Sequence, residues 1–415
     1  MSSVVRALIP ASIAACVWFG YRHVGGALSG LGDPVPAGSW RCDVSYPGSA
    51  LLPSIFLALA EKRSSPDDQD ALYLVVRRGR VQRGEVQWED AMPVSHAKLP
   101  GHRTMNPCPL YHPDTDTVFL FFVCVKSEIS EFRQIITGRN AARLCYVTSR
   151  DHGQSWSLPK DVTEEVLGED LKSCATLTVG PGHGVCSPSG RLIVPAYLYY
   201  IHSRVCGLPV PWKTKPHSFI FYSDDRGESW HKGSGLWRQK TGECEVAEVT
   251  CSSGNDLLYC SARTGQRYRV EATSSPQSME FTDAHYNKSL CEPPHGCQGS
   301  VVSYRPPEAT QDEADGGEES PLQHSVTSWL LYSHPTSSRG RVDLGVYLNK
   351  SPLVPSTWTP PWVINEGPSG YSDLAVCQDT HSFACLFECG KDAVCEKIVF
   401  RRFTMDELLN NSSKP

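Results

Sequence analysis

Short runs of β-branched and aromatic residues, separated by Gly, Pro, Asp or Ser, follow one another from Ser49 almost to the end of the chain. Runs of this length between turn-forming residues are typical of β-strands. Helical periodicity is weak throughout, and only residues 161–171 predict a short helix, with Thr163 as its N-cap. The expected strands are 55–60, 73–77, 117–125, 143–149, 191–200, 218–223, 257–262, 300–304, 328–333, 344–348, 383–387 and 397–403. The pattern predicts an all-β chain.

One octapeptide pattern occurs twice, as SRDHGQSW at 149–156 and as SDDRGESW at 223–230. Each copy directly follows a strand-like run, so each is expected to be a tight turn. The Asp can accept hydrogen bonds from the turn's own backbone, the Gly supplies a positive φ, and the Trp is expected to be buried. The recurrence indicates repeated β units.

The composition limits the classes of partner. A chain of 415 residues suits two average domains or one large β unit, and the unbroken series of strands favours one unit. A formal net charge of -6 argues against binding a nucleic-acid backbone or an anionic bilayer through bulk charge, so any membrane contact must be local. The 17 cysteines lack metal-ligand spacing, and neither a zinc site nor a compact disulfide framework is indicated.

Three segments are expected to lie outside the β unit. Residues 7–20 form an apolar run that is too short to span a bilayer. It suits a signal peptide, a short anchor or an atypical N-terminus. We therefore expect an N-terminal segment and linker at 1–40, a β domain at 41–405 and a C-terminal tail at 406–415. An acidic, Gly- and Pro-rich stretch at about 306–325 predicts a disordered insertion within the domain.

The repeated octapeptide resembles the Asp box of the sialidase family. Four more segments are similar to vertebrate sialidases: HRTMNPCP at 102–109, GRNAARLC at 138–145, VGPGHG at 179–184 and CEPPHGCQGS at 291–300. The resemblance runs from about residue 50 to 403 and is strongest to the plasma-membrane, ganglioside-cleaving branch. It implies a six-bladed β-propeller with Asp-box turns. A third box, expected at 274–281, has lost its Asp and its Gly.

Two arginines match the family's carboxylate-binding positions. A sialic acid carries a carboxylate on its anomeric carbon, and guanidinium groups bind carboxylates in a bidentate geometry. By resemblance, Arg263 in SART and Arg341 in RVDLG are the second and third of these arginines. From the residues alone, each arginine would be interpreted as a surface ion-pair partner, as exposed arginines usually are.

The first family arginine is absent from its expected place. The family segment reads YRIPALL, whereas the best match here is YPGSALL at 46–52, so that Pro47, Gly48 and Ser49 replace Arg-Ile-Pro. Glu388, in CLFEC, matches the acid that supports this arginine and is expected to lack its partner. Arg41 lies a few residues upstream and is a candidate replacement.

The resemblance also supplies a nucleophile and its base. Sialidases use a tyrosine nucleophile in place of a carboxylate. A neutral phenol avoids repulsion by the substrate's own carboxylate. Tyr371 in GYSDL matches this nucleophile, and Glu243, the first acid of ECEVAEV, matches its general base. Spacing alone leaves Glu245 and Glu248 open as alternatives to Glu243.

The acid/base group is expected in a loop close to the first strand. Asp68 follows Glu61-Lys62-Arg63 by five residues, as the family's acid/base does. Asp67 and Asp70 remain rivals, and Asp residues after Ser-Pro are also common in plain turns. Arg63 and Glu61 are expected to support the same site.

The remaining pocket residues come from the resemblance as well. Contacts to the N-acetyl and glycerol groups of the sugar are expected from Met105, Asn106, Glu131, Tyr197, Tyr199 and Gln298. Alternation along a strand places both tyrosine rings on one face, an arrangement that suits a propeller core equally well. No metal and no organic cofactor is implied.

The function indicated is an exo-α-sialidase that retains anomeric configuration through its tyrosine. Expected substrates are gangliosides, sialylated oligosaccharides and glycoproteins at a membrane surface, with no nucleic-acid partner. The expected location is the plasma membrane or an endosomal or lysosomal membrane, with the cytoplasm as the alternative. Two other functions stay open, namely a sialoglycan-binding or catalytically weakened propeller and a plain interaction propeller without a sugar site.

Overall fold

The computed structural model describes residues 41–44, 55–64, 68–82, 85–251, 256–274, 279–306, 326–377 and 382–412. For 41–44 it describes the backbone alone. The expected N-terminal segment, the Pro47–Ser49 replacement, Asp67 and all but the first residue of the expected acidic insertion therefore lie outside the described residues.

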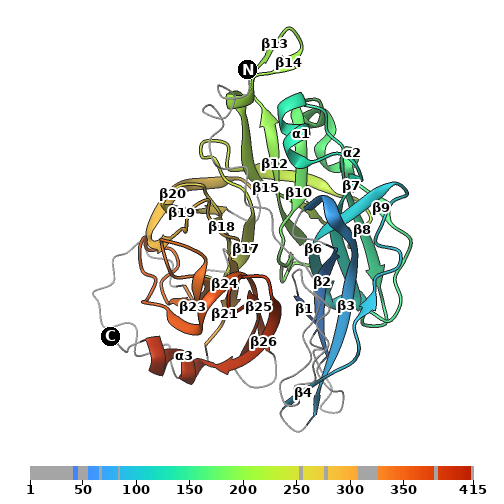
Figure 1. The fold of residues 1–415 in the computed structure, drawn as a ribbon. Coiled ribbons are helices and arrows are strands. Elements are labelled where there is room, and N and C mark those ends of the chain that lie inside the picture. The colour runs from blue at the N-terminus through green and yellow to red at the C-terminus, as the bar shows by residue number, and fades with distance from the viewer. Residues whose placement is uncertain are drawn as a thin grey trace.

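The described strands stand in antiparallel sheets around a common centre (Figure 1). The first sheet holds β1 (Arg41–Val44), β2 (Ile55–Arg63), β3 (Ala71–Gln82), β4 (Glu85–Trp88) and β5 (Met92–Pro93). The second holds β6 (His102–His112), β7 (Thr117–Lys126), β8 (Ala142–Ser149) and β9 (Lys160–Asp161). The third holds β10 (Cys174–Val179), β11 (Val185–Cys186), β12 (Leu192–Ile201), β15 (Thr214–Ser223) and β16 (His231–Gly235).

Two further sheets close the arrangement. The fourth holds β17 (Cys244–Val249), β18 (Leu257–Ala262), β19 (Tyr268–Ser274) and β20 (Phe281–Cys291). The last holds β21 (Ser300–Tyr304), β22 (Trp329–Pro335), β23 (Val342–Asn349), β24 (Trp362–Cys377), β25 (Ser382–Cys389) and β26 (Lys397–Thr404). A separate hairpin of β13 (Arg204–Val205) and β14 (Leu208–Pro209) extends from the end of β12. The all-β class and the propeller arrangement are confirmed.

The number of sheets differs from the expected six blades. Within the described residues there are five sheets of four to six strands, because β24 belongs to two groups of strands. The first part of β24, up to Pro368, pairs with β23, where Val342 is the partner of Pro368. The second part begins at Ser369, which pairs with Cys389 of β25. The six-stranded sheet thus consists of two units joined end to end by one long strand.

Both octapeptides fold as the sequence predicts. In the second copy, Asp225 accepts a hydrogen bond from the Ser229 backbone at 2.9 Å, and Gly227 donates its N–H to the Ser223 hydroxyl at 2.8 Å. Gly227 has φ of 91°. Hydrogen bonds from Ser229 and Ser223 lower the pKa of Asp225 to about 2. The first copy makes the equivalent bonds between 149 and 155.

The turn tryptophans fill the space between sheets. Trp230 is fully buried, and its ring meets the ring of Phe121 edge-on, with centroids 4.8 Å apart. Phe121 belongs to β7, so this contact joins the second sheet to the turn that follows β15. Each Asp box therefore packs its indole against an adjacent part of the propeller.

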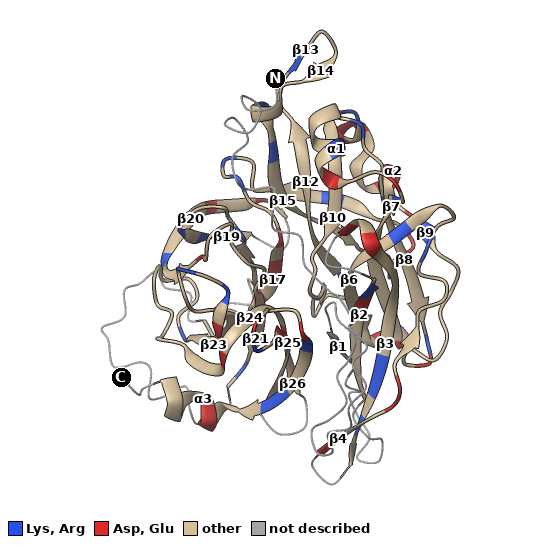
Figure 2. Cartoon of the chain, viewed as in Figure 1, with Lys and Arg blue, Asp and Glu red and all other residues tan. Residues whose placement is uncertain are grey.

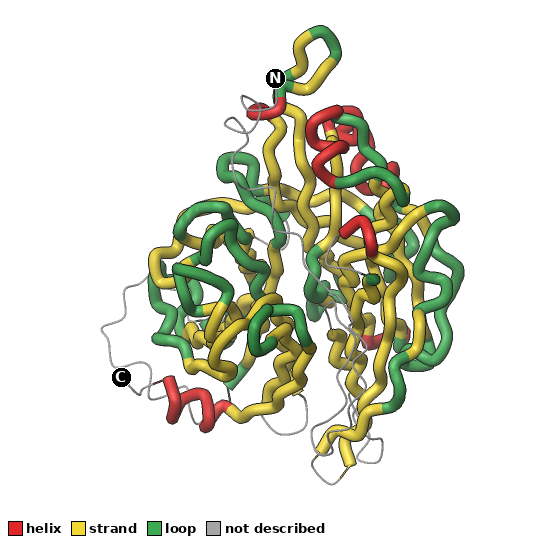
Figure 3. The backbone as a smooth tube through the Cα atoms, in the orientation of Figure 1, coloured by secondary structure: helices red, strands yellow, loops and turns green. Residues whose placement is uncertain are grey.

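The helices in the described part of the chain are short (Figure 3). They are α1 (Glu131–Thr137), α2 (Thr163–Leu167), α3 (Met405–Ser412) and the short 3₁₀ helices η1 (Asp68–Asp70), η2 (Pro113–Thr115), η3 (Gly168–Ser173) and η4 (Pro211–Lys213). The helix expected at 161–171 is present as α2 and η3, but Thr163 is not its N-cap. Val162 occupies that position, because the Thr163 hydroxyl instead accepts a hydrogen bond from the Leu144 backbone in β8 at 2.8 Å.

Candidate active site

The predicted nucleophile, base and second arginine lie in direct contact. Tyr371 in β24 donates its phenol proton to Glu243, which directly precedes β17. Arg263, just after β18, donates to the Tyr371 oxygen at 2.9 Å and pairs with the other Glu243 oxygen at 2.5 Å. Tyr371 and Glu243 are both buried. The geometry suits a carboxylate that removes the phenol proton as the oxygen attacks a substrate.

The structure separates the three candidate bases. Glu245 is buried, and its carboxylate accepts from the Val301 backbone at 3.0 Å and from the Gln298 amide at 3.2 Å. Glu248 is half-buried, and burial together with the nearby Asp256 raises its pKa to about 7. Of the three acids, Glu243 is the one that contacts Tyr371, as the resemblance implies.

Charges around Tyr371 act in opposite directions. Burial and the adjacent Glu243 raise the pKa of the phenol well above its usual value, whereas Arg263 and Arg341 lower it. The Arg341 guanidinium lies 5.4 Å from the centroid of the Tyr371 ring, and one of its nitrogens donates to the Gly296 carbonyl at 2.9 Å. The phenol is therefore neutral at rest, with two cations beside it.

A second cluster holds the predicted acid/base group. Asp68, at the start of η1, pairs with Arg63 at 2.6 Å, and Arg63 pairs with Glu61 at 2.5 Å. The other Glu61 oxygen accepts from the Asn106 backbone at 3.3 Å. Arg63 and Glu61 are buried, whereas Asp68 keeps part of its carboxylate exposed. The ion pair of Asp68 with Arg63 is the observation that favours Asp68 as the acid/base group.

Glu131 lies between the two clusters. It stands in the first turn of α1, and burial, Asp68 and Glu243 together raise the pKa of its carboxyl to about 7. Glu131 and Glu243 also contribute to the raised pKa of the Tyr197 phenol, after burial. These interactions indicate that Asp68, Glu243, Glu131 and Tyr197 lie near one another.

Further predicted pocket residues lie on β6 and β12. The rings of Tyr197 and Tyr199 in β12 meet edge-on with centroids 6.4 Å apart. Met105 and Asn106 lie where the pairing of β6 with β7 is interrupted, and Asn106 takes a positive φ of 55°. The Asn106 amide donates to the Thr178 hydroxyl at 2.7 Å. Their contacts with a sugar stay predictions.

Gln298 is held by the protein itself. Its amide donates to the carbonyls of Pro181 and Ser372 at 3.2 and 3.0 Å, and it accepts from the Ser372 backbone at 3.1 Å. The side chain is buried. In this arrangement Gln298 fixes the strand directly behind Tyr371, and a direct contact with substrate stays a prediction.

The sequence assigned no role to His183 and Asp373, which lie together with Glu245, one of the alternative bases, near Tyr371. Their ligand-type atoms are within 4.8 Å of one another, so among the described residues this is the group that could hold a metal ion. His183 is already bonded to Asp373 at 2.8 Å, and Ser300 donates to the same Asp373 oxygen at 2.9 Å. The one sequence signal was the position of His183 within the Gly- and Pro-rich segment 179–184.

Glu388 has one satisfied oxygen and one without a partner. One oxygen accepts from the Tyr371 backbone at 3.2 Å, and the other has no hydrogen bond within the described part of the chain. Gly370 permits this approach, because a Cβ there would lie 2.3 Å from the Glu388 carboxylate. Burial raises the pKa of Glu388 to about 8, against the opposing effects of the Tyr371 N–H, Arg341 and Arg63. The expected position of the missing arginine lies outside the described residues, so its lack stays a prediction.

The Glu388→Gln variant is expected to gain stability relative to the parent chain as the pH rises from 5 to about 8.5. The folded parent retains a proton on Glu388 that the unfolded chain releases above its ordinary pKa of 4.5. This contribution to stability is therefore full below about pH 4.5 and is lost as the pH rises through about 8. The relative gain should reach roughly 2–4 kcal/mol in denaturant titrations.

The matched control for this measurement is Glu366→Gln, which changes an exposed glutamate in the same strand. It should show no comparable pH dependence. A Glu388→Gln variant that is less stable than the parent at pH 8.5 would mean that the carboxylate is ionised and paired with a cation.

The fold and this site together define a class of enzyme. A β-propeller that buries a tyrosine against a glutamate, beside two arginines and a separate, partly exposed carboxylate, has the groups required of a glycoside hydrolase with a tyrosine nucleophile. The comparisons with known proteins agree with this class. The family model for the BNR repeat-like domain matches residues 56–384.

Curated relatives narrow the class to one family. Over 373 residues the chain is 51% identical to Sialidase-3 of Homo sapiens, with 86% of this chain and 87% of the relative covered. It is 39% identical to Sialidase-4 of Mus musculus over 447 residues, with coverage of 89% and 92%. The chain belongs to the sialidase family.

Solved structures support the same fold. The Hadza microbial sialidase Hz136 superposes with a TM-score of 0.64 at 22% identity, over 85% of this chain and 64% of that one. The intramolecular trans-sialidase from Ruminococcus gnavus, in complex with oseltamivir carboxylate, gives 0.63 at 15% identity, over 87% and 93%. At these identities the likeness concerns the fold alone.

Proposed function

We propose that this chain is an exo-α-sialidase that releases terminal sialic acids with retention of configuration, using Tyr371 as nucleophile. The observation that carries the proposal is the contact of the Tyr371 phenol with both Glu243 and Arg263. Membership of the sialidase family, shown by a relative of 51% identity, supports the same activity.

The first half of the reaction forms a sialyl-tyrosine. Glu243 takes the phenol proton while the Tyr371 oxygen bonds to the anomeric carbon. The bond from that carbon to the leaving oxygen breaks, and Asp68 protonates the leaving oxygen. In the second half, Asp68 takes a proton from water, the water oxygen displaces the tyrosine, and Glu243 returns the proton to the phenol. Two inversions at one carbon give overall retention.

Substrate recognition is proposed to use the cations beside Tyr371. Arg263 and Arg341 are the groups that would bind the substrate carboxylate, since charge-assisted guanidinium contacts are strong and directional. Arg63 and Glu61 would hold Asp68 in place. The wall formed by Met105, Asn106, Glu131, Tyr197, Tyr199 and Gln298 would surround the N-acetyl and glycerol groups.

The proposed substrates are gangliosides, together with sialylated oligosaccharides and glycoproteins, at a membrane surface. High identity to Sialidase-3 over most of both chains supports the general substrate class. Within the described residues, none of the helices has the length and apolar character needed to cross a bilayer. A membrane-associated location is therefore proposed to depend on surface contact or on segments outside the described part of the chain.

Six blades remain our proposal for the architecture. The change of partner within β24 supports counting β21, β22, β23 and the first part of β24 as one blade. The second part of β24, with β25 and β26, would be another.

Turnover of a fluorogenic α-sialoside by the purified chain tests the proposed function. We expect hydrolysis, with the α-anomer of sialic acid as the first product in a proton NMR time course. Release of the β-anomer first would contradict the tyrosine mechanism. Saturable binding of the sialoside without hydrolysis would instead favour the sialoglycan-binding alternative. That alternative is supported by the Glu388 oxygen that has no hydrogen-bond partner among the described residues.

A further inference from the structure

Exposed apolar side chains are concentrated on the hairpin β13–β14 and the turn that follows it. Val205, Leu208 and Trp212 are 63%, 66% and 74% exposed, although they lie within eight residues of one another. Isolated exposed apolar residues are normal on a soluble protein, whereas a cluster of large ones marks an interaction surface. In Figure 1 this hairpin projects beyond the rest of the propeller.

The end of α1 packs against the base of the same hairpin. A Cβ added at Gly138, the C-cap of α1, would lie 3.0 Å from both Ile201 and Pro209. The side chains of Phe132 and Ile136 in this helix are also exposed. Together these elements form one region, which we call the hairpin surface and define by Phe132, Ile136, Val205, Leu208 and Trp212.

The chain around these apolar residues is basic. Arg204, Lys213 and Lys215 lie within or beside the hairpin, and no acidic residue occurs between 202 and 223. Figure 2 shows basic positions here. Burial lowers the pKa of His202, and Lys215 and Lys213 lower it further, so both lysines lie close to His202. This local positive charge stands out in a chain whose net charge is -6.

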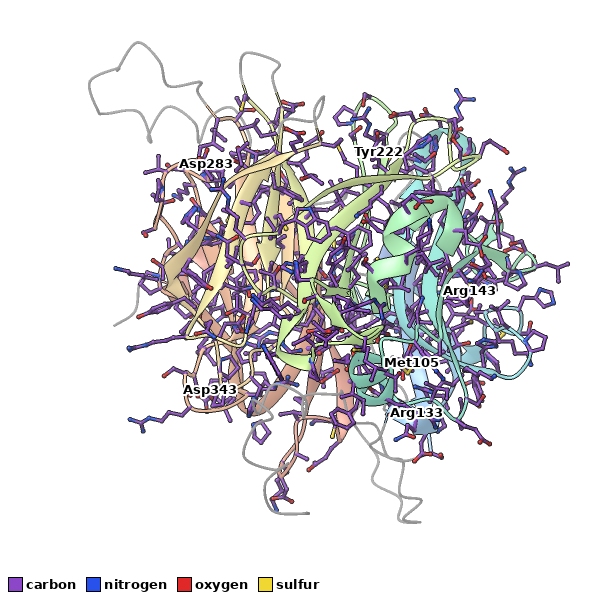
Figure 4. The ribbon with its side chains drawn as sticks, turned by 90° about the horizontal axis from the view of Figure 1, so that it is seen from above. Met105, Arg133, Arg143, Tyr222, Asp283 and Asp343 are labelled. Atoms are coloured by element: carbon purple, nitrogen blue, oxygen red, sulfur yellow. The ribbon has the colours of Figure 1, made fainter. Side chains whose placement is uncertain are left out.

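The hairpin surface lies next to the site. Its helix α1 begins at Glu131, whose carboxyl interacts with Asp68 and Glu243. The view in Figure 4 places Met105, Arg133 and Asp343 toward one face of the molecule and Tyr222 and Asp283 toward the opposite face. A partner that contacts the hairpin surface would therefore lie close to a helix that contributes a residue to the site.

We propose that the hairpin surface docks on an anionic lipid bilayer. Val205, Leu208 and Trp212 enter the boundary between headgroups and acyl chains, and Lys213 and Lys215 contact anionic headgroups. Exposed indole and aliphatic groups flanked by lysines suit this boundary, where apolar and charged environments meet. A two-fold contact with a second copy suits the surface less well, because it would bring like-charged lysines together. The inference rests on the proposed function in one respect, because docking would bring a sialylated lipid of the membrane to the site.

Cosedimentation of the full chain with vesicles tests the proposal. Binding is expected to phosphatidylcholine vesicles that contain about 20% phosphatidylserine, and to be weaker without it. The double variant Leu208→Ala with Trp212→Ala should reduce the partition coefficient about 10- to 100-fold. Replacing Lys213 and Lys215 by glutamate should reduce it roughly fivefold or more per residue and weaken its dependence on salt.

Leu158→Ala is the matched control, because Leu158 is 75% exposed but follows the first Asp box. It should bind vesicles like the parent chain. Equal binding by all variants would overturn the proposal, as would a loss of dimers in the Trp212 variant without any vesicle binding.

A soluble fluorogenic sialoside separates this proposal from the proposed function. The Leu208 and Trp212 double variant should hydrolyse the soluble sialoside like the parent, and should lose activity on sialylated lipid in vesicles. If the parent chain bound vesicles but hydrolysed neither substrate, and the double variant lost that binding, the docking surface would be supported and the enzyme assignment would be wrong.

Discussion

Replacing Tyr371 by phenylalanine is expected to lower kcat on a fluorogenic sialoside by at least about a thousandfold. The substitution removes the phenol oxygen that contacts Glu243 and Arg263, and it keeps the buried ring. Glu243 and Arg263 remain paired with each other at 2.5 Å, so the charges of the site stay balanced. The loss should therefore appear in turnover and not in folding.

The thermal midpoint and kcat of the same preparation check this expectation. Tyr332→Phe is the matched control, since Tyr332 is also fully buried and its hydroxyl has no hydrogen-bond partner in the described part of the chain. The control should retain activity. If the Tyr371 variant hydrolysed the sialoside at the parental rate, the nucleophile would be another group.

Restoring Arg-Ile-Pro at positions 47–49 is expected to raise kcat/KM on the same sialoside by about 10- to 100-fold. A third guanidinium would add a charge-assisted contact to the substrate carboxylate. It would also supply the partner that the free oxygen of Glu388 lacks among the described residues.

A version with Met-Ile-Pro at 47–49 is the control, because it changes the backbone in the same way but brings no charge. The gain from arginine should also shrink when Glu388 is replaced by glutamine. Equal kcat/KM values for the parent and the arginine version would mean that Arg41 or another cation already fills the role, and the prediction of a weakened enzyme would be wrong.

The strands and turns were largely predictable because their determinants are local. The run 55–60 became part of β2, and both octapeptides formed the expected turns, since side chains within a few residues satisfy the backbone. The helix α1 was missed. It has only seven residues and depends on Ser130 as N-cap and on Gly138 at its end, so it has too few turns to show a periodic pattern.

The site required the family resemblance, since its residues come from distant strands. Glu243 and Tyr371 are 128 positions apart and meet only because β17 and β24 both line the centre of the propeller. Spacing left Glu245 as a rival of Glu243, because residues two apart face the same side of a strand. Glu243 accepts a hydrogen bond from the Tyr371 phenol, whereas Glu245 accepts one from the Val301 backbone. These contacts form only in the closed fold.

The partner exchange in β24 has a consequence for how this chain tolerates changes in length. Tyr371 stands three residues after Pro368, the last residue paired with β23, and the β25 ladder is irregular between Ser369 and Ser372. A one-residue slip of a strand turns its side chains to the opposite face. Inserting or deleting a residue in β24 would therefore either shift its pairing with β23 or move the Tyr371 phenol away from Glu243. Surface loops can vary in length, whereas the length of β24 is fixed by its pairing with β23 in its first part and with β25 in its second part.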